Sequence, residues 1–201
     1  MSARNVELTE YVIDIFHRHI DHAMQAIEPL TPNIASASEA LVATLLSDGK
    51  ILSCGEGSSG LLSQHFAGSL LNRFQRERPG LPVISLNGDA AMLTAIATDA
   101  SFTEIFAKQI RTLAQPQDSV LLISHGTGSG TALQTIQSTH DRGARVIVLC
   151  NEDADIRALL SSEDIELNIG EATRAQFMEI ALLVLHSLCE LIELQLFGSE
   201  V

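Results

Sequence analysis

Basic residues are scarce in this chain of 201 residues: lysine and arginine number 12, aspartate and glutamate number 25, and the net charge is −13. Contact with a nucleic-acid backbone requires a basic face, so we expect no direct nucleic-acid partner. The same net negative charge disfavours binding to an anionic membrane surface. The chain is nevertheless expected to fold, because 46% of its residues are hydrophobic and only 18% are charged.

Cysteine is also rare. Cys54, Cys150 and Cys189 are odd in number and far apart, which argues against a disulfide framework or a zinc knuckle and favours buried thiols in a reducing cytoplasm. Long apolar runs are missing as well, since no segment approaches the ~20 residues of a membrane span. Acidic residues interrupt the first twenty positions, so no signal peptide is predicted. We therefore expect a cytoplasmic protein that forms a single domain over residues 1–201.

Apolar residues near the N-terminus recur at steps of three and four, which predicts a helix over 5–28 and a second helix over 33–47. Pro29 and Pro32 are expected to separate the two helices. This helical pair, within residues 1–48, lies outside the minimal sheet pattern, and so does a strongly apolar helix predicted over 173–197. We expect both to take part in oligomerisation.

Five short apolar segments alternate with helical segments over residues 49–201. Such near-continuous apolar runs are typical of parallel strands whose two faces are both covered by helices. The pattern predicts an α/β fold, a three-layer αβα sandwich around a five-stranded parallel sheet, with ligands bound beyond the carboxyl ends of the strands. The expected strands are 50–54, 82–86, 119–124, 145–150 and 164–169, and the helix after the first strand is expected to reach Arg78.

Two loops rich in glycine and hydroxyl side chains each follow a strand and open a helix. They span Gly55-Glu-Gly-Ser-Ser-Gly60 and His125-Gly-Thr-Gly-Ser-Gly130. Glycine lets the backbone approach a ligand closely, and a helix N-terminus offers unpaired N–H groups to an anion. A single loop of this kind is explained by tight turns and helix caps. Two on neighbouring strands favour a site for a phosphate monoester.

These loops and their surroundings resemble the sugar isomerase (SIS) family, in particular its phosphoheptose isomerase branch. The resemblance implies a flavodoxin-like sheet of five parallel strands, a homotetramer, and ligand sites near subunit boundaries. The end of the chain, 188–197, is similar to the DnaA initiator-associating proteins (DiaA), which are non-enzymatic members of this branch. The segments that carry the resemblance are Cys54-Gly-Glu-Gly-Ser-Ser-Gly60, Gln64-His-Phe-Ala67, Asn72-Arg-Phe74, Glu77-Arg-Pro79 and Lys108-Gln-Ile-Arg111.

The resemblance implies a phosphate cradle made of serines from both loops, and this chain retains it in part. Gly126 and His125 replace two hydroxyl residues of the family's second loop. Glu56 replaces the asparagine usual in the first loop, and a carboxylate there would repel a bound phosphate by about 1 kcal/mol in water. The alternatives are that Glu56 points to solvent or pairs with an arginine. The candidate ligand-binding residues are Ser58, Ser59, Asp89, Ser124, Thr127 and Ser129.

The resemblance also implies two proton-transfer residues, and here the chain departs from the family. His65 is kept and His186 matches the acid, but Ser69 stands where the carboxylate base is expected. A serine hydroxyl is too weak a base to remove a carbon-bound proton unaided. The metal held in many members would lose two polar ligands here, a glutamate replaced by Ser69 and a glutamine replaced by Met178, so neither a metal nor another cofactor is predicted. Glu179 is the nearest substitute base, offset from Met178 by about 100° around the helix.

Three functional hypotheses follow. The leading one is a homotetramer without isomerase activity, with vestigial His65 and His186, that binds the initiator DnaA and promotes its assembly. Leu196 and Phe197 are its candidate partner-binding residues, although this apolar pair could equally be tucked against a neighbouring subunit. The first alternative is a phosphoheptose isomerase that converts sedoheptulose 7-phosphate to D-glycero-D-manno-heptose 7-phosphate. The other is a phosphosugar sensor that binds without turnover.

Overall fold

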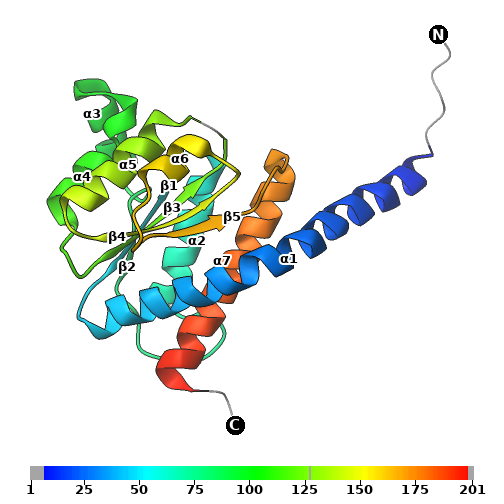
Figure 1. Ribbon diagram of the computed structural model, residues 1–201, viewed down its shortest axis with the longest axis horizontal. Helices are drawn as coiled ribbons and strands as arrows, with labels where there is room; N and C mark the ends of the chain where they lie inside the picture. The colour runs from blue at the N-terminus through cyan, green and yellow to red at the C-terminus, as the bar shows by residue number, and fades with distance from the viewer. Residues whose placement is uncertain (1–6, 127, 199–201) are drawn as a thin grey trace.

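Five parallel strands form the centre of the structure, a computed structural model that describes residues 7–126 and 128–198 (Figure 1). The strands lie in the order β2-β1-β3-β4-β5. All four neighbouring pairs are parallel, so the predicted sheet is confirmed, in the flavodoxin-like order. The strands are β1 (Ile51–Gly55), β2 (Val83–Ser85), β3 (Ser119–Ser124), β4 (Arg145–Cys150) and β5 (Ile165–Asn168).

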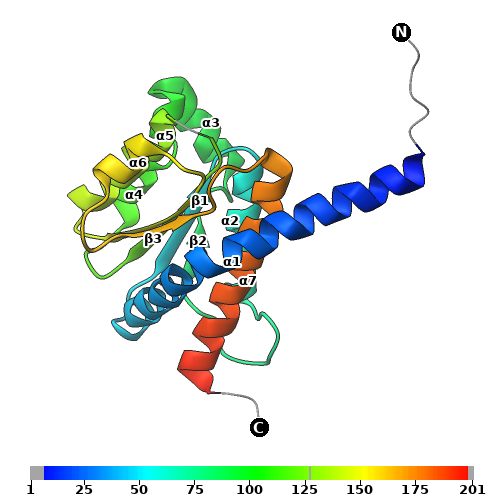
Figure 2. The ribbon, with the colours of Figure 1, turned by 45° about the vertical axis from the view of Figure 1, so that its right-hand side comes forward.

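Helices cover both faces of the sheet, which confirms the predicted three layers (Figures 1 and 2). Successive side chains of a strand point to opposite faces. Leu121 of β3 accordingly lies in one core with α1, α2 and α7, whereas Leu122 lies in the other. The first layer holds α1 (Leu8–Leu46), α2 (Ser58–Leu71) and α7 (Arg174–Phe197); the second holds α3 (Ala90–Asp99), the 3₁₀ turn η1 (Phe102–Glu104), α4 (Ala107–Leu113), α5 (Gly130–Asp141) and α6 (Ala154–Leu159).

The N-terminal helical pair predicted within residues 1–48 is wrong, because α1 is one continuous helix with Pro29 and Pro32 inside it (Figure 1). A proline inside a helix removes a backbone donor and costs about 3 kcal/mol. Tertiary contacts between and after the prolines offset that cost. Leu30 and Leu41 are buried in the core shared with α7, and the Asn33 side chain donates to the Glu166 carbonyl of β5 at 2.9 Å.

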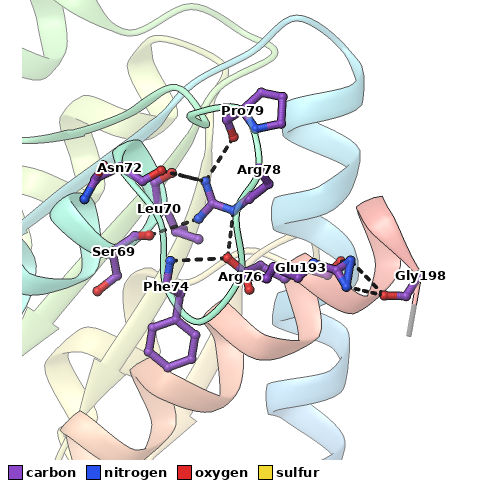
Figure 3. A network of polar contacts seen from close by, with 9 residues as sticks. All are labelled: Ser69, Leu70, Asn72, Phe74, Arg76, Arg78, Pro79, Glu193 and Gly198. Atoms are coloured by element: carbon purple, nitrogen blue, oxygen red, sulfur yellow. Dashed lines mark hydrogen bonds and ion pairs between the residues drawn. The ribbon is translucent and has the colours of Figure 1, made fainter. Parts of the chain in front are cut away.

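The helix after the first strand, α2, was predicted to reach Arg78, but it ends at Leu71. Arg78 instead folds back, as Figure 3 shows, and donates to the carbonyls of Ser69 and Leu70 at 2.9 and 2.7 Å. Those carbonyls lie in the last turn of α2, where helical partners run out. The Arg78 guanidinium also pairs with Glu193 of α7 at 2.7 Å, and only 1% and 5% of the two side chains are exposed. This buried ion pair ties the loop over 72–82 to α7.

The C-terminal helix α7 is long and apolar enough to cross a membrane, judged by length and composition alone. A core helix of a soluble protein passes the same test. Phe177, Leu185 and Ile192 of α7 are fully buried against the core, and α7 packs on α1 and α2. We therefore describe α7 as a core helix of the first layer.

Candidate functional site

The two glycine-rich loops start side by side at the carboxyl ends of β1 and β3. Gly55, the last residue of β1, is in register with Ile123 of β3. The first loop then leads into α2 on one face of the sheet and the second into α5 on the other. In open α/β sheets a ligand binds at such a point, where the strand order reverses. The structure thus brings together the two loops on which the sequence analysis placed the ligand.

Close backbone approach explains two of the glycines. A Cβ at Gly55 would lie 2.7 Å from the Ile123 carbonyl oxygen and 2.7 Å from Ser59 Cβ, and a Cβ at Gly60 would lie 2.7 Å from Asn87 Nδ2. Asn87 bonds both backbone groups of Gly55, as acceptor at 3.1 Å and as donor at 2.8 Å. The sequence analysis did not single out Asn87; its position directly after β2, facing the β1 loop, is the signal that could have identified it.

Serine hydroxyls line this end of the sheet. Ser59 and Ser124 are buried, and Ser124 Oγ has no hydrogen-bond partner among the described residues. A buried hydroxyl without a partner is costly, so this atom fits a site that is completed by a ligand. Ser129 caps α5 by accepting from the Ala132 amide at 3.1 Å. Ser58 is the first residue of α2. Thr127, the remaining loop candidate, lies outside the described residues.

Asp89, the remaining candidate ligand-binding residue, caps a different helix. Its carboxylate accepts a hydrogen bond from the Met92 amide at 2.9 Å and so begins α3. None of the hydrogen bonds in the described part of the chain links the Asp89 side chain to either loop. Helix capping accounts for this aspartate.

The Glu56 carboxylate links the two loops by a hydrogen bond. Its Oε2 atom accepts a hydrogen bond from the hydroxyl of Ser129 across the cradle. The carboxylate thus faces the cradle, as the first interpretation of the sequence expected, and the two alternatives, toward solvent or toward an arginine, are not what the structure shows. None of the ion pairs among the described residues includes Glu56.

His65 of α2 and His186 of α7 meet directly, with their Nε2 atoms 2.8 Å apart. One Nε2 must donate and the other accept, which requires a neutral imidazole on the accepting side. Burial lowers the pKa of His186, and the positive charge that His65 can carry lowers it further. The ring of Phe74 packs on His186 with centroids 5.3 Å apart. The two histidines, 121 positions apart in sequence, thus form one hydrogen-bonded pair.

The second loop is anchored on α7 by His125, whose ring lies 5.1 Å from that of Phe177. Burial lowers the pKa of His125, and the nearby Arg174 guanidinium acts in the same direction. His125 therefore remains neutral at pH 7 and serves as a packing residue of the loop.

The donor set around the histidine pair does not fit the metal that the family resemblance implies. Ser69 lies one turn after His65 on α2 and is 9% exposed. Within the described residues, no group of three histidine, cysteine, aspartate or glutamate side chains is placed to hold a metal ion. Catalytic zinc sites use three protein ligands and structural sites four. Two imidazoles with a serine and Met178 nearby fall short of this, and we derive no step that uses a metal.

A carboxylate lies in the same groove as His186, two helical turns away along α7. Glu179 precedes His186 by seven residues, two helical turns, and so lies on the same side of α7. Its Oε2 atom contacts His19 Nδ1 of α1 at 2.6 Å. Glu179, His19 and His186 all line a groove of about 500 Å³ between α1 and α7, whose other walls are apolar, including Phe16 and Ile20.

The two C-terminal candidates for partner binding are both engaged within the chain. Leu196 packs against the core of the first layer. The Arg76 guanidinium lies 5.6 Å from the centroid of the Phe197 ring and donates to the Gly198 carbonyl at 2.7 Å (Figure 3). Phe197 remains 40% exposed. Partner binding by this pair therefore stays a prediction, with Leu196 packed against the core and Phe197 partly exposed.

Known proteins of similar sequence and similar fold share this architecture. A protein-family model described as "SIS domain" matches residues 16–151. Phosphoheptose isomerases from Chromohalobacter salexigens and Alkalilimnicola ehrlichii are 46% and 42% identical over 189 residues, which is 94% of this chain and 96% of each relative. The solved phosphoheptose isomerase of Neisseria gonorrhoeae superposes with a TM-score of 0.86 at 32% identity, covering 92% of this chain and 98% of that one. That of Francisella tularensis superposes with a TM-score of 0.88 at 35% identity, covering 93% and 98%.

These relatives correct the leading functional hypothesis. An initiator-binding protein without isomerase activity was expected from Ser69 and from the C-terminal residues, yet proteins at 42–46% identity over almost the whole chain are named phosphoheptose isomerases. The family resemblance inferred from the loops is confirmed, and the chain belongs to the SIS domain family.

Proposed function

We propose that this protein is a cytoplasmic phosphosugar isomerase of the phosphoheptose type, which interconverts sedoheptulose 7-phosphate and D-glycero-D-manno-heptose 7-phosphate. The observation that carries the proposal is the 2.8 Å contact between His186 of α7 and His65, which lies on α2, the helix that begins at the first serine loop. The relatives named phosphoheptose isomerase support the same reaction class.

The phosphate group is bound by the two loops. The N-termini of α2 and α5 direct backbone N–H groups toward this end of the sheet, where they attract an anion. The hydroxyls of Ser59, Ser124 and Ser129 add donors, and that of Ser124 has no partner among the described residues. His65 follows Ser59 by six residues, about 9 Å along α2. That separation suits a sugar whose phosphate and reacting carbons are at opposite ends of its chain.

The histidine pair moves the proton. A neutral imidazole accepts a proton from C1 of the ketose, and the electron pair of the broken C–H bond forms the C1=C2 bond. The π pair of the C2 carbonyl moves to its oxygen, which takes up a proton to give an enediol. Loss of the proton on the C1 oxygen and return of a proton to C2 then give the aldose. His186 suits the accepting role, because burial and the neighbouring His65 lower its pKa and keep it neutral at pH 7.

A second function, phosphosugar binding without turnover, is favoured by a different observation. Ser69 occupies the position of the expected carboxylate, one turn after His65. If the histidine pair alone is too weak a base, the loops would still bind the ligand and the protein would act as a sensor. Binding of the sugar phosphate would then raise the melting temperature of the protein, and the sugar would not be converted.

The test is a turnover assay on purified protein, with sedoheptulose 7-phosphate followed by NMR. We expect product from the wild type and a loss of about 10²–10⁴-fold in kcat for His186→Ala. Ser187→Ala, at the neighbouring position of α7, is the matched control and should retain activity. Ser69→Glu adds the missing carboxylate and is expected to raise kcat. Saturable binding without product would favour the sensor, and absence of binding would exclude both functions.

We further propose that the active form is a homotetramer. The N-terminal part of α1 projects beyond the sheet and its helices (Figures 1 and 2). It carries apolar side chains that none of the described residues covers, including Phe16 at 63% and Met24 at 62% exposure. Contiguous apolar surface of this kind is typical of subunit contacts. Light scattering should give four times the chain mass of 21.6 kDa, and Phe16→Glu should reduce it; a monomeric wild type would exclude the assembly.

A further inference from the structure

The phosphate cradle of this chain already contains an anion of its own. Glu56 follows β1 directly, and its carboxylate reaches the second loop, where it accepts the hydrogen bond of the Ser129 hydroxyl. Neither a lysine nor an arginine in the described part of the chain pairs with it. The negative charge of Glu56 is therefore uncompensated by a side-chain cation at the end of the sheet where a sugar phosphate would bind.

Ser129 cannot serve Glu56 and a phosphate together. Its hydroxyl has one proton to donate, and that proton goes to Glu56. Its oxygen accepts from the Ala132 amide at 3.1 Å as the cap of α5, which fixes the side chain in place. A phosphate oxygen that uses the Ser129 donor must displace the carboxylate, while Ser124 Oγ, buried and without a partner among the described residues, stays available.

The other donors of the cradle, the backbone N–H groups at the N-termini of α2 and α5, attract both the Glu56 carboxylate and a phosphate. Helix N-termini attract a carboxylate as well as a phosphate, and both α2 and α5 begin at these loops. If Glu56 stayed in place, two anions would share one set of donors, and like charges held within a few ångströms repel each other strongly. The ligand can escape this repulsion only when the Glu56 side chain leaves Ser129.

We propose that the Glu56 carboxylate is an intramolecular competitor for the phosphate position, so that a sugar phosphate binds by displacing it from Ser129. This inference rests on the proposed function, because it assumes that the loops bind a phosphate group. Glu56 would thus set the affinity of the site for phosphorylated sugars: it weakens their binding and fills the cradle when no ligand is present.

Calorimetric titration with sedoheptulose 7-phosphate tests the proposal. Glu56→Gln keeps the size of the side chain and removes its charge, and we expect its Kd to be at least tenfold lower than that of the wild type. Glu163→Gln is the matched control: it removes the same charge from an exposed side chain beside the amino ends of β4 and β5, and its Kd should stay within twofold of the wild type. Unphosphorylated sedoheptulose should not distinguish Glu56→Gln from the wild type.

Each outcome separates the inference from the function on which it rests. If wild type and Glu56→Gln bind the sugar phosphate equally, or the variant binds more weakly, the competitor role is overturned and the phosphosugar function stands. If neither binds any phosphorylated ligand, both are overturned. Glu56→Ala provides a second variant that cannot bond Ser129 and should also bind more tightly than the wild type, and circular dichroism establishes that each variant is folded.

Discussion

Removal of the Glu193 carboxylate should destabilise the protein strongly. Glu193 accepts from Arg78 Nε at 2.7 Å and from the Phe74 amide at 3.3 Å, and 1% of the Arg78 side chain is exposed. In Glu193→Ala the guanidinium stays buried without its counter-charge. Breaking a buried pair in this way costs about 3–5 kcal/mol, which for a chain of this length corresponds to a fall in Tm of about 6–20 °C.

The remaining Arg78 bonds should place the loss at the lower end of this range. Arg78 keeps its hydrogen bonds to the carbonyls of Ser69, Leu70 and Pro79 at 2.9, 2.7 and 3.1 Å (Figure 3). These contacts stabilise the guanidinium through partial charges, although none replaces a full negative charge. The loop that carries Phe74 should loosen as well, so contact of Phe74 with His186 should weaken.

Thermal unfolding followed by circular dichroism at pH 7.5 measures the effect. The matched control is Glu77→Ala, which removes an exposed carboxylate of the same loop that pairs with Arg73 at the surface. Surface pairs contribute little, so the control should melt within about 2 °C of the wild type. A fall of less than about 3 °C for Glu193→Ala would show that the Arg78–Glu193 pair does not hold the loop on α7.

Three further predictions concern other parts of the molecule. Because burial and the charge that His65 can carry lower the pKa of His186, kcat/KM should stay constant down to the usual imidazole pKa of about 6.5 and fall only below it; a steep fall already at pH 7 would contradict this. Burial raises the pKa of Asp164, but hydrogen bonds from Ser161, Val146 and His140 outweigh it and lower the pKa below the usual value. This carboxylate therefore stabilises the fold above about pH 4 and loses that contribution as the pH falls through its folded-state pKa, so Asp164→Asn should lower Tm at pH 7 and by much less at pH 3; a loss that does not depend on pH would refute the linkage. Gly55→Ala places a Cβ 2.7 Å from the Ile123 carbonyl oxygen and from Ser59 Cβ and should cost about 1–3 kcal/mol in urea unfolding, whereas an unchanged midpoint would show that β1 and α2 can move apart.

The hydrophobic pattern was sufficient to predict the sheet. The bounds of β3 and β4 match the apolar runs 119–124 and 145–150, since both strands are central and buried on both faces. The helix bounds were less predictable. Pro29 and Pro32 normally end a helix, and packing of α1 on α7 and β5 overrides that local preference.

The location of the candidate site could be predicted from the sequence, but its side-chain contacts could not. The composition of the loops after β1 and β3 was sufficient to place a ligand site there, because parallel strands bring their carboxyl ends to one edge. The contact between Glu56 and Ser129 spans 73 positions and that between His65 and His186 spans 121. No spacing rule predicts contacts of this range.

The sequence by itself determined the fold class, because apolar runs alternate regularly along the chain. Its loop motifs located the serine loops, and their resemblance to the SIS family indicated the family. Only the tertiary structure decided the length of α1, the fold-back of Arg78 and the direction of the Glu56 carboxylate. Each of these depends on a partner from a distant element, and the free energy of that contact exceeds what the local residues prefer.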